Sequence, residues 1–206
     1  MRIIILGFNS FVGSAISNYF NFVNGVELVH VGRKKSHLHN VVKFEVLNNI
    51  DLLDQGVKDL VASLDLDNSV LINCISMGDV DKCEVDRDGC KVQNYQFVEV
   101  LYKHIRKTKF KKFIHFSTNA VYDGNNAPYK ESSDCSPVNF YGLMKLKADN
   151  FLLNQKDLRV MVVRPITMYG RAPSDGRDNP VSMIIKKLQA GQKLKLVNDV
   201  LVNILY

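Results

Sequence analysis

Short apolar runs alternate along the chain with longer segments in which apolar residues recur at helical spacing. The runs are rich in Val and Ile and cover residues 2–6, 26–31, 41–46, 69–73, 112–116 and 159–163. Both alternating positions are apolar in them, which is typical of parallel strands covered on both faces. The segments with helical spacing lie between the runs, at residues 11–22, 50–64, 88–107 and 141–154.

This alternation predicts an α/β fold of the Rossmann type, a doubly wound parallel sheet with right-handed crossovers. The chain has 206 residues, of which 46% are apolar, so it is long enough for one sizeable core. No run approaches the roughly 20 apolar residues that cross a bilayer. The apolar run at the N-terminus is also too short for a signal peptide. We therefore expect a cytoplasmic protein without a membrane partner.

Charge and cysteines add little to this picture. The net charge is +6, and the basic residues are dispersed apart from residues 33–35 and 103–112. No nucleic-acid-binding motif accompanies them, and an anionic small molecule explains the charge equally well, so we expect no nucleic-acid partner. The four cysteines lack Cys-x-x-Cys spacing and paired histidines, so we expect free, mostly buried thiols and no metal site.

The first predicted strand runs directly into a turn that contains two glycines and leads into a helix. Glycines let a backbone turn tightly and approach a pyrophosphate, whose charge the amides at a helix N-terminus favour. An ordinary strand-to-helix turn would also fit two glycines, but the place between the first strand and a helix favours a dinucleotide site. The expected cofactor contacts are Gly7, Asn9, Ser10, Phe11, Val12 and Gly13.

The second strand ends at Arg33 and Lys34, at the place where an acidic residue would bind the ribose hydroxyls of NAD. Positive charge favours the 2′-phosphate of NADP, although a solvated basic turn would have the same sequence. NADP is therefore our first choice of cofactor and NAD the second. Glu45, at the end of the third strand, is placed to reach the adenine, and would be equally ordinary as a surface carboxylate.

Tyr141 is the one tyrosine of eight with a lysine four residues later, and this Tyr141/Lys145 pair opens a helical segment. One helical turn puts both side chains on one face, where an ammonium stabilises a phenolate. Tyr141 would be the general acid for a ketone that receives hydride, with Lys145 as electrostatic partner and ribose ligand. A surface helix pair is the alternative when the two residues are taken alone.

The fifth strand delivers Ser117 and Thr118 to the carboxyl edge of the sheet, where doubly wound folds bind ligands. A hydroxyl there can polarise a substrate carbonyl, and we choose Thr118 for this role. Without Tyr141 and Lys145, a turn cap would be the better interpretation.

In chain order, these residues resemble the extended short-chain dehydrogenase/reductases, in particular the branch that contains dTDP-4-dehydrorhamnose reductase. The matching pieces are Gly7 to Gly13, Asn73, residues 80–84, Asn94, residues 117–124, 128–131 and 136–145, Arg164-Pro165 and Tyr169-Gly170. The resemblance covers essentially the whole chain. It implies NADP-dependent reduction of a nucleotide-linked keto-sugar in polysaccharide sugar biosynthesis.

The resemblance also implies roles for single residues. Thr118, Tyr141 and Lys145 would be catalytic, and Asn94 would support their site. Asn73 and Arg164 would belong to the cofactor pocket. The histidines, His115 included, have no role by this resemblance.

The chain departs from the family pattern in three ways. Ser10 replaces the usual middle glycine of the turn, and Asn119 and Ala120 replace an Asp-Tyr pair common in dehydrorhamnose reductases. The family also continues well beyond residue 206. We expect residues 1–170 to form the cofactor-binding domain, and residues 171–206, with their apolar end, to form only the beginning of a largely absent substrate lobe.

Two other functions stay open. One is a sugar-nucleotide 4-epimerase of the same fold. The other is a non-catalytic dinucleotide-binding module that regulates a partner, as in the family's regulatory subunit of methionine adenosyltransferase. The intact Tyr141/Lys145 pair argues against such a module, and the missing lobe argues for it. The resemblance further suggests a homodimer, in which the helices of Asn94 and Tyr141 form a four-helix bundle.

Overall fold

A computed structural model describes residues 1–33, 40–170, 179–195 and 204–205. Its main sheet has the strand order β3-β2-β1-β4-β5-β6, and each neighbouring pair is parallel. The strands are β1 (Arg2–Leu6), β2 (Glu27–Gly32), β3 (Val41–Lys43), β4 (Val70–Asn73), β5 (Lys112–Phe116) and β6 (Val160–Val163). The chain reverses its direction across the sheet between β1 and β4, which is the switch point of a doubly wound fold. The predicted Rossmann-type fold is confirmed.

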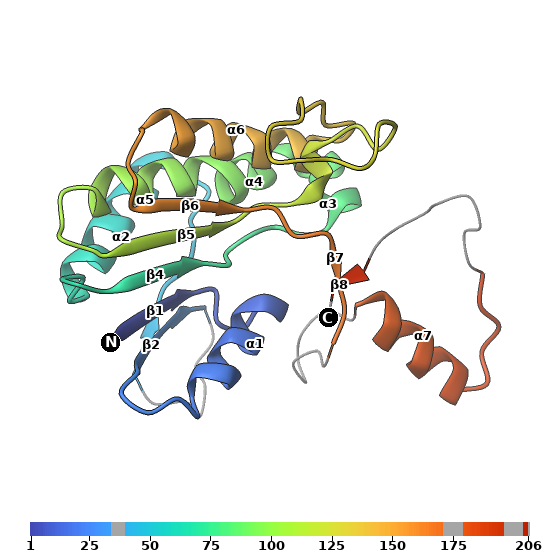
Figure 1. The fold of residues 1–206 in the computed structure, drawn as a ribbon, viewed down its shortest axis with the longest axis horizontal. Coiled ribbons are helices and arrows are strands. Elements are labelled where there is room, and N and C mark those ends of the chain that lie inside the picture. Colours follow the sequence, from blue (N-terminus) through green and yellow to red (C-terminus); the bar gives the residue numbers. More distant parts are fainter. Residues whose placement is uncertain (34–39, 171–178, 196–203, 206) are drawn as a thin grey trace.

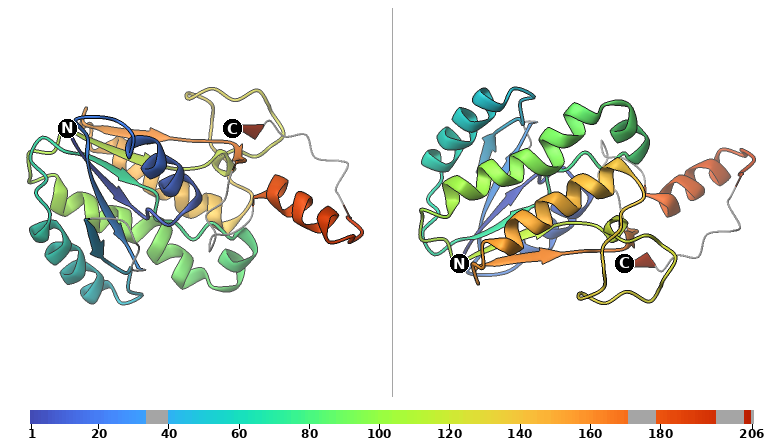
Figure 2. Two further views of the ribbon diagram at one scale, coloured as in Figure 1. Left: turned by 90° about the horizontal axis from the view of Figure 1, so that it is seen from below. Right: turned by 90° about the horizontal axis from the view of Figure 1, so that it is seen from above.

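Helices cover the two faces of the sheet unequally. In Figures 1 and 2, α1 (Phe11–Phe20) lies on one face, while α2 (Ile50–Ser63), α5 (Phe97–Ile105) and α6 (Phe140–Asn154) lie on the other. The shorter elements are α3 (Val80–Val85), α4 (Arg87–Lys91), the π-helical turn η1 (Val92–Gln96), the 3₁₀ turn η2 (Asn119–Val121), α7 (Pro180–Gln189) and the parallel pair β7 (Thr167–Met168) and β8 (Ile204–Leu205).

Alternating side chains of β1 build the two parts of the core. Ile4 and Leu6 join the larger cluster beneath α2, α5 and α6, whereas Ile3 and Ile5 join the smaller cluster on the side of α1. Successive side chains of a strand point to opposite faces, so a run that is apolar throughout is buried only when both faces are covered. The continuous Ile-Ile-Ile-Leu run therefore becomes a central strand.

Two of the predicted elements differ clearly from the observed ones. β3 ends at Lys43 rather than at residue 46. The Phe44 amide still donates to the Gly32 carbonyl at 3.0 Å, and its buried ring packs on Phe97 at a centroid distance of 5.7 Å. Glu45 is thus an exposed residue beyond the strand. The helix predicted at residues 88–107 is divided into α4, η1 and α5, and the π-helical turn contains Asn94. Such turns are frequent at functional sites.

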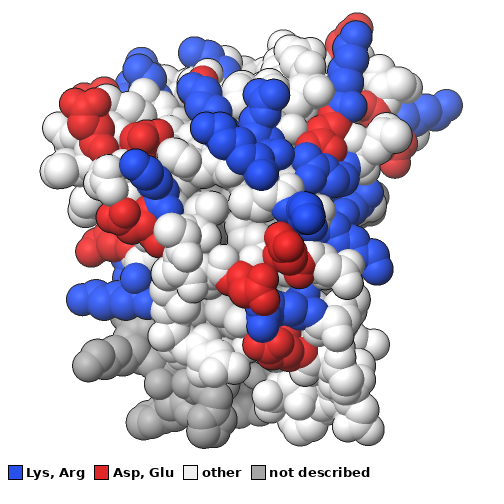
Figure 3. Space-filling view, turned by 90° about the vertical axis from the view of Figure 1, so that its left-hand side faces the viewer, with Lys and Arg blue, Asp and Glu red and all other residues white. Residues whose placement is uncertain are grey.

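Much of the basic charge lies at the end of the molecule where the strands begin. Figure 3 shows Lys and Arg gathered in the upper half of this end. The connection from α5 to β5 supplies exposed Arg106, Lys107, Lys109 and Lys111. The carboxyl ends of the strands lie at the other end of the molecule. The net charge by itself therefore does not indicate that an anionic ligand binds at those carboxyl ends.

The cysteines and the apolar segments were the subject of two expectations from composition. The four cysteines are free, and Cys74, Cys83 and Cys90 are buried. Within the residues that the structure describes, no helix has the length and apolar character to cross a membrane.

Candidate functional site

The glycine turn between β1 and α1 is tight because other backbone lies against it. Gly7 has φ +82°, and a Cβ there would lie 2.9 Å from the Cys74 carbonyl carbon; a Cβ on Gly13 would overlap the Gly7 oxygen. Ser10 caps α1, since its hydroxyl accepts a hydrogen bond of 3.0 Å from the Gly13 amide. The amides of Phe11 and Val12 follow in the first turn, where a helix offers no acceptor, so they can bind an anion.

The residues expected around an adenosine lie at the neighbouring strand ends. Gly32 ends β2 beneath the turn, where an added Cβ would lie 2.9 Å from the Asn9 Oδ1 atom. Arg33 follows it and is exposed. Glu45 is exposed beyond β3, and Lys34 lies outside the described residues. The glycine turn and Arg33 thus share one edge of the sheet.

The start of α6 brings the Tyr141 hydroxyl to Thr118. The Asn139 side chain caps the helix by accepting a hydrogen bond of 2.8 Å from the Gly142 amide. A Cβ on Gly142 would overlap the Ala120 carbonyl oxygen, so the glycine permits close packing of α6 on η2. Burial raises the pKa of Tyr141, and hydrogen bonds with the Ser76 and Thr118 side chains oppose this rise. The phenol is therefore protonated at neutral pH.

Thr118 also has the structural role that the sequence left open. Its Oγ1 accepts a hydrogen bond of 3.1 Å from the Ala120 amide and caps η2. The cap orients the Thr118 hydroxyl, which also hydrogen-bonds the Tyr141 side chain. Ser117, the second choice, is buried, and its hydroxyl faces the Asp149 carboxyl group, whose pKa it helps to lower.

Lys145 lies one turn further along α6 and is buried. Its side chain is 1% exposed, and Nζ is 2.5 Å from the Phe116 carbonyl oxygen and 3.4 Å from His115 Nε2. Burial lowers the pKa of Lys145 to about 8, although the Asp149 carboxylate and the Cys74 thiol act in the opposite direction. The amine therefore changes charge close to neutral pH.

His115 is a part of the site that sequence reasoning missed. It is fully buried on β5, and burial and the Lys145 charge hold its pKa well below the usual range. Its Nδ1 lies 3.1 Å from the Asn73 Nδ2 atom, while Asn73 Oδ1 accepts a hydrogen bond of 3.1 Å from the Ile75 amide. The side chain of Asn73, expected in the cofactor pocket, thus contacts the imidazole.

Asn94 holds the segment that carries Ser76. Its Oδ1 accepts hydrogen bonds from the Ser76 hydroxyl at 2.8 Å and the Met77 amide at 3.0 Å. Its Nδ2 donates to the Met77 carbonyl at 3.2 Å and to the Cys90 thiol at 3.2 Å. Since Ser76 hydrogen-bonds Tyr141, Asn94 acts on the phenol through this serine. Ser76 itself carried no signal in the sequence.

Arg164 is bound to groups of the protein. Its Nε donates to the fully buried Asp149 carboxylate at 2.9 Å, and its Nη1 donates to the Tyr122 hydroxyl at 3.1 Å. The Tyr122 ring stacks on Tyr129 at 4.4 Å. Arg164 therefore ties α6 to the loop that follows Thr118.

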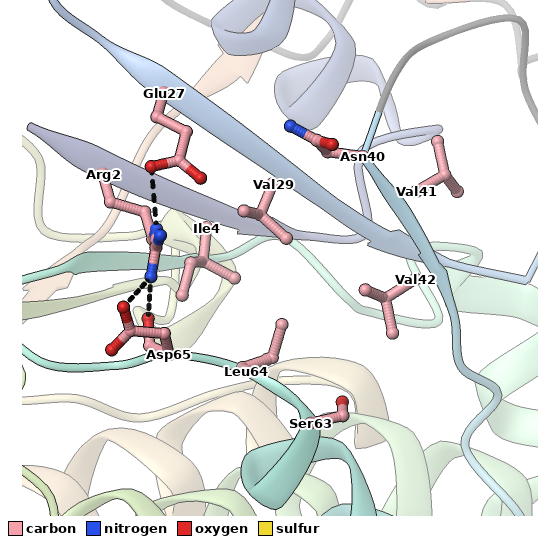
Figure 4. Close-up of a pocket in the computed structure, with 10 residues that line it drawn as sticks. All are labelled: Arg2, Ile4, Glu27, Val29, Asn40, Val41, Val42, Ser63, Leu64 and Asp65. Atoms are coloured by element: carbon pink, nitrogen blue, oxygen red, sulfur yellow. Dashed lines mark hydrogen bonds and ion pairs between the residues drawn. The ribbon is translucent and has the colours of Figure 1, made fainter.

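A hollow lies at the opposite edge, where β1, β2 and β3 begin beside the end of α2. Figure 4 shows Arg2 between Glu27 and Asp65 at this place. Arg2 pairs with Glu27 at 3.0 Å and also with Asp65. Arg2 is thus paired with two carboxylates of the protein, and none of the residues expected to be functional lies there.

Comparison with known proteins identifies the family. A family model described as the RmlD substrate binding domain matches residues 1–203. The chain belongs to this family. This RmlD-domain chain is 26% identical over 192 residues to methionine adenosyltransferase 2 subunit beta of Bos taurus. The matched region covers 93% of this chain and 54% of the relative. It thus spans about half the length of that relative.

Two further comparisons concern reductases. The RmlD-domain chain is 34% identical over 99 residues to dTDP-4-dehydrorhamnose reductase of Burkholderia thailandensis. The matched region covers 47% of this chain and 33% of the relative. The solved structure of the Bacillus anthracis dTDP-4-dehydrorhamnose reductase, a complex with NADP, has a TM-score of 0.68 at 21% identity, over 92% of this chain and 60% of that one. The structural likeness shows the shared fold.

In this RmlD-domain chain, the carboxyl edge of β1, β4 and β5 gathers most of the residues expected to act. The glycine turn follows β1, Asn73 ends β4, Thr118 follows β5, and α6 adds Tyr141 and Lys145. No group of three or more potential metal ligands occurs among the described residues. The edge thus combines a tight glycine turn at a helix N-terminus with a protonated phenol and a lysine of lowered pKa.

Proposed function

We propose that the chain is the cofactor-binding part of an NADP-dependent reductase that acts on a nucleotide-linked keto-sugar in polysaccharide sugar biosynthesis. The observation that carries the proposal is the contact of the Tyr141 and Thr118 hydroxyls at the sheet edge that also bears the glycine turn. Membership of the RmlD family and the match to a dTDP-4-dehydrorhamnose reductase support it.

The residues around the glycine turn fit a dinucleotide. Side chains at positions 7 and 13 would occupy the space that the backbone needs, and the first amides of α1 have no acceptor within the helix and can bind a phosphate. We assign the pyrophosphate to residues 7–13, the 2′-phosphate to Arg33 and Lys34, and the adenine to Glu45. Asn73, Lys145 and Arg164 complete the assigned pocket. When bound, the cofactor supplies a hydride.

The raised pKa of Tyr141 suits the direction of this reaction. A phenol that stays protonated at neutral pH is ready to donate its proton to a carbonyl oxygen as hydride reaches the carbon. Thr118 hydrogen-bonds the same oxygen and polarises the carbonyl. An ammonium at Lys145 stabilises the resulting phenolate and binds the cofactor ribose.

The remaining assignments concern domains, partner and location. We assign residues 1–170 to the cofactor domain and residues 171–206 to the first part of a substrate lobe. Exposed Leu143 and Leu153 on α6 support a homodimer through the helices that carry Asn94 and Tyr141. The free buried thiols suit the reducing cytoplasm, where we place the protein. Sedimentation and cell fractionation test the dimer and the location.

A titration with NADPH and NADH, followed by NADPH oxidation with a dTDP-4-keto-6-deoxyhexose, tests the function. We expect tighter binding of NADPH and turnover that depends on the sugar nucleotide. Failure to bind either dinucleotide would refute the cofactor site. The second candidate is a regulatory module, which the match to methionine adenosyltransferase 2 subunit beta over 93% of the chain favours. Binding without turnover would support it.

A further inference from the structure

The hydrogen bonds of Asn73 fix the protons of the buried His115 ring. The Ile75 amide is a donor, so the Asn73 atom that it meets at 3.1 Å is the carbonyl oxygen. The other end of the same amide is then the NH₂ group, which faces His115 Nδ1 at 3.1 Å. Since this NH₂ group can only donate, Nδ1 must accept and carries no proton.

The second ring nitrogen must therefore hold the only proton of the neutral ring. Full burial is the main cause that keeps the pKa of His115 well below its usual range, so the imidazole is uncharged whichever form Lys145 takes. A neutral imidazole has one N–H and one bare nitrogen. With Nδ1 bare, the Nε2–H of His115 faces the Lys145 Nζ atom, which lies 3.4 Å away.

This arrangement discriminates between the two forms of Lys145. An ammonium has donors only and would set an N–H against the N–H of the ring, whereas an uncharged amine offers a lone pair to Nε2–H. The amine still has hydrogens for the Phe116 carbonyl at 2.5 Å. We propose that His115, oriented by Asn73, is a positioning residue that holds Lys145 and favours its uncharged amine.

Other charged or titratable groups face Lys145 and set the limits of this effect. Asp149 on α6 and Cys74 after β4 raise the pKa of the amine, and burial outweighs them to give a value of about 8. Asp149 is itself paired with Arg164, which weakens its pull on the lysine. His115 on β5 then adds a fixed N–H dipole that disfavours the ammonium. The inference rests on the proposed function for its catalytic meaning, and on the burial and hydrogen-bond geometry of His115 for the protonation states.

Nitrogen-15 NMR of the histidine rings tests the proton assignment in the cofactor-free chain. At pH 7 we expect His115 to show a protonated Nε2 and a bare Nδ1, with its signals assigned by their loss in His115→Phe. A proton on Nδ1, or a doubly protonated ring at this pH, would overturn the proposal. Neither result depends on turnover.

The second measurement follows the Lys145 side chain with pH, using carbon-13-labelled lysine and assignment by loss of the signal in Lys145→Met. His115→Phe keeps an aromatic ring but removes the opposing N–H, so the pKa of Lys145 should rise by about one unit. The matched control is His30→Phe, because His30 is also buried but lies on β2 and contacts Ser17 at 2.7 Å. This control should leave the Lys145 titration unchanged.

A fall in the pKa of Lys145 in His115→Phe would show that the ring accepts from an ammonium, and no change would show that it does not tune the amine. Either result contradicts the proposal. If His115→Phe does not fold, His115→Gln replaces it, since the amide oxygen can turn toward Nζ and should raise the pKa as well. In turnover assays, the alkaline limb of kcat/KM should move in the same direction. Absence of turnover in the unsubstituted chain would count against the proposed function and leave the NMR result standing.

Discussion

Replacement of Arg164 by methionine should strongly destabilise the fold, because it leaves a buried carboxylate without its partner. Asp149 is fully buried, and its carboxylate accepts a hydrogen bond of 2.9 Å from Arg164 Nε. Burial already raises the pKa of Asp149, with Arg164 and the Ser117 hydroxyl opposing the rise. Removal of one partner from a buried pair costs about 3–5 kcal/mol, a large part of the roughly 5–15 kcal/mol that stabilises a domain.

The pH dependence of Arg164→Met identifies the carboxylate as the cause. A carboxyl group with a raised pKa in the folded state binds more protons there than in the unfolded chain. The stability that this shift contributes is therefore fully present below the unfolded-state pKa of the carboxyl group and is lost as the pH rises from there through the folded pKa of Asp149, with a slope of up to about 1.4 kcal/mol per pH unit. Loss of the guanidinium raises this pKa further, so the variant should lose more stability between pH 5 and pH 7.5 than the unsubstituted chain.

Urea denaturation at these two pH values measures the effect, and the double variant Asp149→Asn/Arg164→Met is the control. It removes both charges, so it should recover much of the lost stability and lose the added pH dependence. The reasoning would be refuted by an Arg164→Met variant that loses less than about 1 kcal/mol, the value typical of an exposed pair. A double variant no more stable than the single one would also refute it.

Three further substitutions test the proposed site. Tyr141→Phe should lower kcat by at least about 100-fold through loss of the general acid, with NADPH affinity nearly unchanged in a fluorescence titration. Arg33→Ala should weaken NADPH binding by about 10-fold or more and NADH binding far less, since one charge-assisted phosphate contact is lost; equal losses would move the cofactor assignment to NAD. Gly13→Ala should abolish binding of both dinucleotides in calorimetry, because the added methyl group overlaps the Gly7 oxygen.

The sequence predicted the central strands better than the edge and the short helices. β1 and β5 were found at their observed bounds because burial on both faces makes every position apolar. At β3 the apolar pattern continues past Lys43, because Phe44 is buried against Phe97 of a distant helix although the strand has already ended. The sequence did not predict α3, which is a single short helix capped by Asp79. Val80 and Val85 of this helix are exposed, so its apolar residues show no helical periodicity.

Long-range hydrogen bonds explain what the sequence could not show within the site. The spacing of Tyr141 and Lys145 predicted a shared helix face, but it contained nothing about the burial of Lys145 or its contact with Phe116. The π-helical turn at Asn94 depends in the same way on bonds to Ser76 and Met77, which lie 18 and 17 residues away. A residue whose partners come from another strand or loop has no local pattern that distinguishes it from an ordinary core position.

Burial acts in opposite directions on the two titratable side chains of α6 and leaves both uncharged over the same range of pH. It raises the pKa of Tyr141, which favours the neutral phenol, and lowers the pKa of Lys145 toward the uncharged amine. At a pH above about 8, the site thus holds a proton donor beside a neutral base. Below that pH the lysine is charged and can stabilise a phenolate. The groups that set the protonation of Lys145 therefore decide over which pH range loss of the Tyr141 proton is assisted. Two of them, Cys74 after β4 and His115 on β5, come from outside α6 and so have no place in a helix motif.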